Sequence, residues 1–137
     1  MLVPKKVKHR KWHKGRSKNR KVETRGLSVA YGQYGLKALE PARLNSRQIE
    51  AARKAITGHM NRRGRLWIRV FPDKPITMRP PETTMGGGKG SVDHYVALVL
   101  PGRVVFEVDG VEGEVAKRAL TLAGHKLPFK SRIITKE

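Results

Sequence analysis

The sequence predicts an α+β fold in which two helices pack on an antiparallel or mixed sheet, and three observations predict it. Residues 46–62 and 112–126 each place apolar side chains on one face of a helix. The stretch RLWIRVF (65–71) alternates between two sets of side chains, as a strand does. The apolar stretches HYVALVL (94–100) and RVVFEV (103–108) flank a Pro-Gly pair, a pattern typical of a hairpin.

Two short strands are expected before the first helix. LSVAY (27–31) is strand-like, and the residues after it, 32–35, are typical of a turn. LKAL (36–39) is expected to form a second short strand that ends before Pro41.

Start and stop signals bound the two helices. Asn45-x-x-Gln48 resembles a capping box, with Asn in place of the usual Ser or Thr. Gly64 is expected to end the first helix, and Pro128 the second. FKSRIIT (129–135) is the last expected strand.

The alternating stretch 65–71 has two different faces. One face is apolar and is expected to join the core: Leu66, Ile68 and Val70. The other places two arginines beside two aromatics: Arg65, Trp67, Arg69 and Phe71. This second face fits either a nucleic-acid surface or a second hydrophobic layer with the arginine heads reaching water, and the pattern leaves both open.

Positive charge is the strongest compositional signal. The 137-residue chain has 30 Lys and Arg against 11 Asp and Glu, a formal net charge of +19. Such a domain repels itself, and a polyanion such as nucleic acid relieves the repulsion. Anionic membrane is the competing partner, but it favours a basic amphipathic helix with an aromatic face, and the sequence has none. The absence of cysteine excludes disulfides and thiolate metal sites.

Half of the charge lies in a basic arm over 1–26, which precedes a single domain over 27–137. The arm has eleven Lys and Arg, one acid, and no period of 2 or 3.6. We expect it to order on a partner, and a solvated tail is the alternative. Trp12 favours the first interpretation, because an indole among cations can stack on a base or ribose. His9 and His13 have no acidic neighbour to complete a metal site, so no metal and no cofactor are expected.

A long loop is predicted over 72–91, where there is no periodic pattern. Its end, TTMGGGKGS (83–91), is not a nucleotide-binding P-loop. Thr83 stands where that motif needs its first glycine, and Gly90 stands where it needs a hydroxyl. Glycines still let backbone N–H groups approach an anion closely, so the expected phosphates are those of a polynucleotide.

Six stretches together are highly specific. They are MLVPKKVKHRKWHKGR at the start, RQIEAAR (47–53), RLWIRVFPDKPIT (65–77), MGGGKG (85–90), PGRVVFEVDGV (101–111) and AGHKLPFKSRI (123–133). In them the chain resembles the bacterial large-subunit ribosomal protein numbered sixteen, whose archaeal and eukaryotic counterpart is numbered ten.

The resemblance implies a structural, non-enzymatic component of the large subunit of the cytoplasmic ribosome, with a role in late assembly. The implied partners are 23S-type rRNA near the peptidyl transferase centre, neighbouring ribosomal proteins and A-site tRNA, with P-site tRNA as a second candidate. No membrane and no homo-oligomer are expected.

Charge and resemblance together select two groups of candidate residues. The expected rRNA-binding residues are Lys5, Lys6, Lys8, His9, Arg10, Lys11, Trp12, His13, Lys14, Arg16, Lys18, Arg20, Lys21, Arg62, Arg63, Arg65 and Arg69. The expected loop residues near the tRNA and the peptidyl transferase centre are Lys74, Arg79, Thr84, Met85, Gly86, Gly87, Gly88, Lys89 and Gly90. Many family members carry Arg and Lys where this chain has Thr84 and Gly87, so no role of that arginine is transferred to Thr84.

Two other classes of protein are weaker alternatives. A stand-alone basic RNA-binding regulator, or one that binds DNA, needs a dimer surface or a groove-reading helix, and the alanine-rich helix over 46–62 is better explained by packing. An enzyme needs a constellation of catalytic groups, and no G-x-S-x-G, H-E-x-x-H or close Cys/His arrangement is present.

Overall fold

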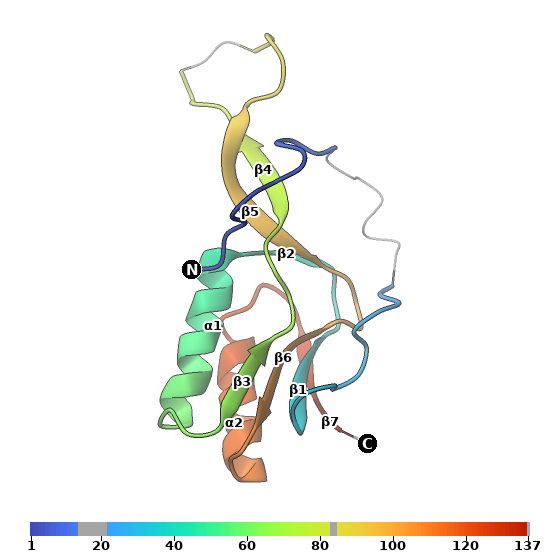
Figure 1. Ribbon diagram of the computed structural model, residues 1–137, viewed down its shortest axis with the longest axis vertical. Helices are drawn as coiled ribbons and strands as arrows, with labels where there is room; N and C mark the ends of the chain where they lie inside the picture. Colours follow the sequence, from blue (N-terminus) through green and yellow to red (C-terminus); the bar gives the residue numbers. More distant parts are fainter. Residues whose placement is uncertain (14–21, 83–84, 137) are drawn as a thin grey trace.

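The computed structural model describes residues 1–13, 22–82 and 85–136, and it confirms the predicted α+β class (Figure 1). Its strands form two separate sheets rather than one. The elements in chain order are β1 (Tyr34–Ala38), β2 (Ala42–Asn45), α1 (Ser46–His59), β3 (Arg65–Ile68), β4 (Lys74–Met78), β5 (Ser91–Val99), β6 (Val104–Asp109), α2 (Gly113–Gly124) and β7 (Ser131–Thr135).

Both sheets are antiparallel. The first has the strand order β3-β6-β1-β7, and the second has the order β2-β5-β4. Helix α2 packs on β1, β6 and β7, while α1 packs against α2 and β2. Figure 1 shows the helices together in the body of the molecule, with β4 and β5 extending away from it. The segment between these two strands therefore lies at one far end.

The core forms where the apolar faces of the helices meet each other, the first sheet and strands β2 and β5 of the second sheet. Helix α1 buries Ile49, Ala52 and Ile56, which recur at helical spacing. Helix α2 buries three alanines and Leu120, and such small side chains let helices approach closely. Burial of each large aliphatic side chain contributes about 1.5–3 kcal/mol to folding.

The prediction of a hairpin over 94–108 is wrong. Strand β5 pairs with β2 and β4, whereas β6 pairs with β1 and β3. The turn at Pro101 and Gly102 carries the chain from one sheet to the other, and the Gly102 N–H donates to the carbonyl of Ala38 at 2.7 Å. Strand β6 has a paired strand on each side inside the first sheet, and its first five residues are all buried.

The segment before the first helix also differs from the prediction. Residues 27–31 form no strand, and β1 begins at Tyr34, where a turn was expected. Strand β2 was not predicted, because Pro41 masks the start of its four-residue pattern. Very short strands carry too little alternation to be recognised without their partners.

The loop predicted over 72–91 is in part a β-hairpin. Its first half contains β4, which pairs with β5 along the opposite side of the hairpin. Pro75 lies within β4, and this is tolerated because β4 is at the edge of its sheet. Between β4 and β5, the described residues 79–82 and 85–90 form no strand.

The predicted capping box is confirmed. The Asn45 side chain accepts from the Gln48 N–H at 2.8 Å, and the Gln48 side chain accepts from the Asn45 N–H at 3.1 Å. Replacing Asn45 by Ala should lower the free energy of unfolding by about 1 kcal/mol, because the Gln48 N–H loses its acceptor and the reciprocal pair is broken. Urea unfolding measures this loss, and Asn45→Asp, which retains an acceptor, should recover most of it. Equal losses in both variants would contradict the capping role.

Candidate nucleic-acid interface

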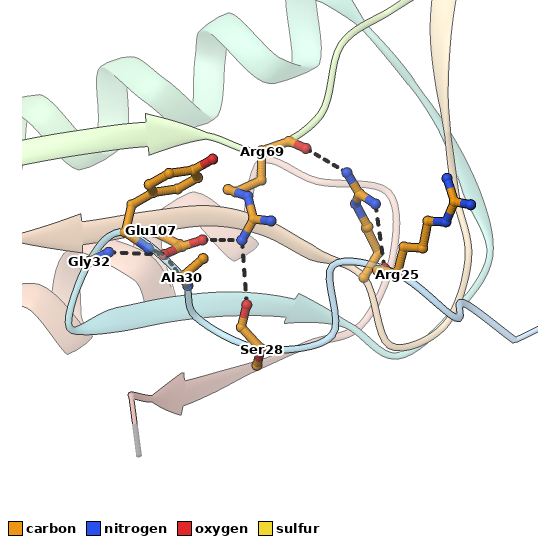
Figure 2. A network of polar contacts seen from close by, with 8 residues as sticks. Arg25, Ser28, Ala30, Gly32, Arg69 and Glu107 are labelled. Atoms are coloured by element: carbon orange, nitrogen blue, oxygen red, sulfur yellow. Dashed lines mark hydrogen bonds and ion pairs between the residues drawn. The ribbon is translucent and has the colours of Figure 1, made fainter.

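A buried carboxylate organises the surface beside β3. Glu107 in β6 is fully buried, and its Oε1 accepts three backbone N–H groups (Figure 2). The donors are Ala30 at 2.9 Å, Tyr31 at 2.7 Å and Gly32 at 3.0 Å. Oε2 pairs with the guanidinium of Arg69. Glu107 thus holds residues 30–32 against the sheet.

Arg69 is held inside this network rather than presented as a free cation. Its side chain is only 17% exposed, and it lies over the Tyr31 ring at 5.2 Å from the centroid. The Tyr31 ring in turn stacks on Trp67, with ring centroids 6.2 Å apart. Arg69 fits neither interpretation of this face, because its guanidinium pairs with the buried Glu107 instead of reaching water or lying open to a nucleic acid. The predicted RNA contact of Arg69 has an internal competitor, so Arg69 is left out of the interface proposed below.

The end of the predicted arm joins the same region. The Glu23 N–H donates to the Pro101 carbonyl at 3.0 Å, and the Val104 N–H donates to the Gly26 carbonyl at 2.8 Å. Arg103 reaches the carbonyl of Arg69 at 2.9 Å and that of Arg25 at 3.4 Å. Residues 22–32 therefore follow a fixed path over the first sheet (Figure 2).

The beginning of the arm lies beside the β4–β5 hairpin (Figure 1). Leu2 packs against the core, and the Ser46 hydroxyl at the start of α1 lies 4.0 Å from the Met1 sulfur. Farther along, the Lys11 ammonium donates to the Lys89 carbonyl at 3.1 Å, and the Lys89 ammonium donates to the Trp12 carbonyl. All predicted RNA-binding residues of this part are exposed: Lys5, Lys6, Lys8, His9, Arg10, Lys11, Trp12 and His13.

The glycines at the end of the hairpin adopt the conformation that only glycine adopts readily. Gly86, Gly87 and Gly88 have φ values of 101°, 78° and 95°. A Cβ added at any of the three would meet open space, so their backbone is accessible. Met85 is 99% exposed, and Arg79 donates to the Gly86 carbonyl at 2.6 Å. We call residues 85–90 the hairpin tip.

The remaining candidate residues lie after helix α1, in strand β4 or outside the described residues. Arg62, Arg63 and Arg65 are exposed beyond the end of α1, a helix of 14 residues that is about 21 Å long. Lys74 lies in β4 and is only 4% exposed. Six candidates lie outside the described residues: Lys14, Arg16, Lys18, Arg20, Lys21 and Thr84.

Sequence reasoning did not find two residues that line the hairpin base. Arg43 in β2 and Thr77 in β4 lie around a hollow with Trp12, Lys74 and Lys89. Arg43 belongs to an unpredicted strand, so its position beside the arm followed from no sequence signal. Within the described ranges, no cluster of His, Asp or Glu could hold a metal ion.

An antiparallel α+β body with an exposed cationic arm and a glycine-rich hairpin tip is typical of a basic nucleic-acid-binding protein. The sequence model of one family, ribosomal protein L16p/L10e, matches residues 4–134. The chain belongs to the ribosomal protein L16p/L10e family. It is therefore a structural constituent of the large subunit of the cytoplasmic ribosome, not an enzyme, and it binds rRNA and other ribosomal proteins.

In the part of the chain that the structure describes, neither helix is long and apolar enough to cross a membrane.

The Glu107 network makes a prediction about pH. Burial raises the pKa of Glu107, but the N–H groups of Gly32 and Tyr31 and the Arg69 guanidinium outweigh burial, so the pKa lies below its ordinary 4.5. A lowered folded-state pKa contributes stability above the unfolded value, and that stability is lost as the pH falls through the folded value. Glu107→Gln should cost about 3 kcal/mol at pH 7, since it leaves Arg69 without its charge partner.

The cost should shrink as the pH falls below about 4.5, because Glu107 takes up its proton there in the unfolded state and in the folded state only at the lower folded pKa. Urea unfolding at several pH values measures both effects. Glu50→Gln removes an ion pair with Arg53 on the surface of α1 and is the matched control, expected to change stability little. A loss for Glu107→Gln that stayed constant down to about pH 3 would contradict the electrostatic assignment.

Proposed function

We propose that the arm and the β4–β5 hairpin together form the rRNA-binding surface, and that the hairpin tip approaches A-site tRNA near the peptidyl transferase centre. The observation that carries this proposal is the direct contact between the two segments at Lys11, Trp12 and Lys89. It places the exposed cations of the arm and the accessible glycine backbone on one extended projection. P-site tRNA is a second candidate for the tip, and we propose a role in late subunit assembly.

Binding on this surface is dominated by phosphate contacts. The cations of the arm are exposed and lie on irregular backbone, so no helix or strand in the described part of the arm presents a row of side chains to base edges. If about ten phosphates are neutralised, the logarithm of the affinity should fall with the logarithm of salt with a slope of about −7 to −9. A slope shallower than about −3 would overturn this account.

Charge removal from the arm tests its part in the surface. Deleting the arm would also remove Leu2, which packs against the core, so neutralisation is the sharper change. A variant with Lys5, Lys6, Lys8, Arg10 and Lys11 changed to Gln should keep the wild-type thermal midpoint within a few degrees. Its rRNA-binding slope should become shallower by roughly three to five, about one for each phosphate that is no longer neutralised.

The control changes five exposed cations elsewhere to Gln: Lys54, Lys117, Arg118, Lys126 and Lys130. The overall charge change is identical, so a smaller loss of rRNA binding in the control would locate the effect in the arm. Co-sedimentation with large subunits should follow the same order. Equal losses in the two variants would mean that net charge, not this surface, determines binding.

The role of the hairpin tip is tested by comparing variants that add side-chain bulk at its glycines with a variant that removes the charge of Lys89. Changing Gly86 or Gly88 to Val forces a β-branched residue into a positive φ and holds an approaching phosphate away from the backbone. Lys89→Ala should matter less for tRNA, because the Lys89 ammonium is turned back to the Trp12 carbonyl. In large subunits matched for content of this protein, peptidyl transfer to A-site tRNA should therefore fall more for the glycine variants.

The isolated chains should have similar thermal midpoints, since a Cβ at either glycine meets no neighbour. Should Lys89→Ala impair transfer more than both glycine variants, the tip acts through a point charge. Wild-type transfer in all three would reduce the tip to a passive linker.

A further inference from the structure

We propose that the hollow between the arm and the base of the hairpin receives a single backbone phosphate of RNA, with Trp12 in its wall. The inference rests on the proposed function and gives that surface one defined contact. We call the hollow the phosphate seat. It is lined by Trp12, Arg43, Lys74, Pro75, Ile76, Thr77 and Lys89.

The size of the seat suits a phosphate group with part of its ribose. Its volume is about 190 Å³, below the roughly 300–1,000 Å³ of pockets that enclose whole small molecules. The aliphatic walls come from Pro75 and Ile76 in β4. A whole nucleotide is thus expected to enter only in part, with its base outside and beside the indole.

Three cations from three separate parts of the chain meet at this seat. Arg43 comes from β2, Lys74 from β4 and Lys89 from the hairpin tip. No Asp or Glu is among the described residues that line it. A larger hollow lined in part by Phe71 differs, because Glu23 and Asp73 lie among its walls. The composition of the seat therefore favours an anion.

The donors of the seat match the geometry of a phosphate. Arg43 supplies a planar guanidinium that can donate two parallel hydrogen bonds, and the two lysines supply compact charges. Thr77 adds a neutral hydroxyl that can donate. Lys74 is 4% exposed, so its charge acts where water screens it little.

The arm completes the seat only when it lies against the hairpin. The contacts that bring them together are reciprocal: Lys89 donates to the carbonyl of Trp12, and Lys11 donates to that of Lys89. These contacts bring cations of the arm close to cations of the hairpin. Repulsion between the like charges opposes this arrangement. A bound phosphate offsets this repulsion, so RNA binding and docking of the arm should favour each other.

The first test observes the indole directly. The chain has two tryptophans, so an amide-type ¹⁵N–¹H spectrum has two indole N–H signals. Titration with single-stranded hexauridylate should shift the Trp12 signal saturably, while Trp67, stacked on Tyr31, stays in place. Inorganic phosphate should compete at higher concentration. An unmoved Trp12 signal would overturn the proposal, as would a response to inorganic phosphate without a response to the RNA.

The second test asks whether two cations share one phosphate. Arg43→Gln and Lys89→Gln should each weaken binding to 23S-type rRNA by about tenfold and lower the salt slope by about one. Because both serve the same phosphate, the double variant should lose little more than either single variant. The matched control is Lys54→Gln on the surface of α1, which should bind almost as the wild type does.

The opposite result in the double variant is that the affinity losses of the two single variants multiply and the salt slope falls by about two. That result would show two independent contacts and overturn the shared seat. Thermal midpoints near that of the wild type exclude unfolding as the cause. The proposed function fails differently: the wild-type chain would then bind rRNA weakly or with a shallow salt slope. The two failures are thereby distinguished in one set of measurements.

Discussion

The buried carboxylate of Glu107 is the interaction on which the arrangement of the body depends. A carboxylate inside a sheet is stable only when hydrogen bonds and an opposite charge replace its water. Here three backbone N–H groups of residues 30–32 and the guanidinium of Arg69 do so. Gly32 is required, because a Cβ there would lie 2.7 Å from the Val108 carbonyl. Glu107 thereby fixes residues 30–32, the last part of the path of the chain from the arm into β1.

Local signals in the sequence were sufficient for the helices and insufficient for the sheets. Three predicted features depend only on neighbours in sequence. They are the Asn45 capping box, the helical periodicity and the last strand, which ends at Thr135. The pairing of β6 with β1 and β3, rather than with β5, depends on residues far apart in the chain. A turn between two apolar stretches has the same sequence whether it closes a hairpin or crosses between sheets.

The composition of the sequence predicted which segments form the proposed interface, but not how their side chains are arranged. Charge and glycine content selected the arm and the tip, and the described cations of the arm and the glycines at 86–88 are exposed. The same reasoning selected Arg69, whose partner Glu107 is 38 residues away and carries no sign of burial in its own sequence context. It missed Arg43 for the converse reason, since a single arginine in a four-residue strand gives no local signal. Partners distant in sequence decide whether a cation faces inward or outward.

Pro75 in β4 also affects the protein before it reaches its RNA. An exposed strand at the edge of a sheet is a template on which a strand of another molecule can add. Proline has no N–H, and within sheets it occurs where that missing donor would face solvent. The outer edge of the hairpin therefore offers an interrupted row of donors. Addition of a strand from another copy along this edge is therefore disfavoured.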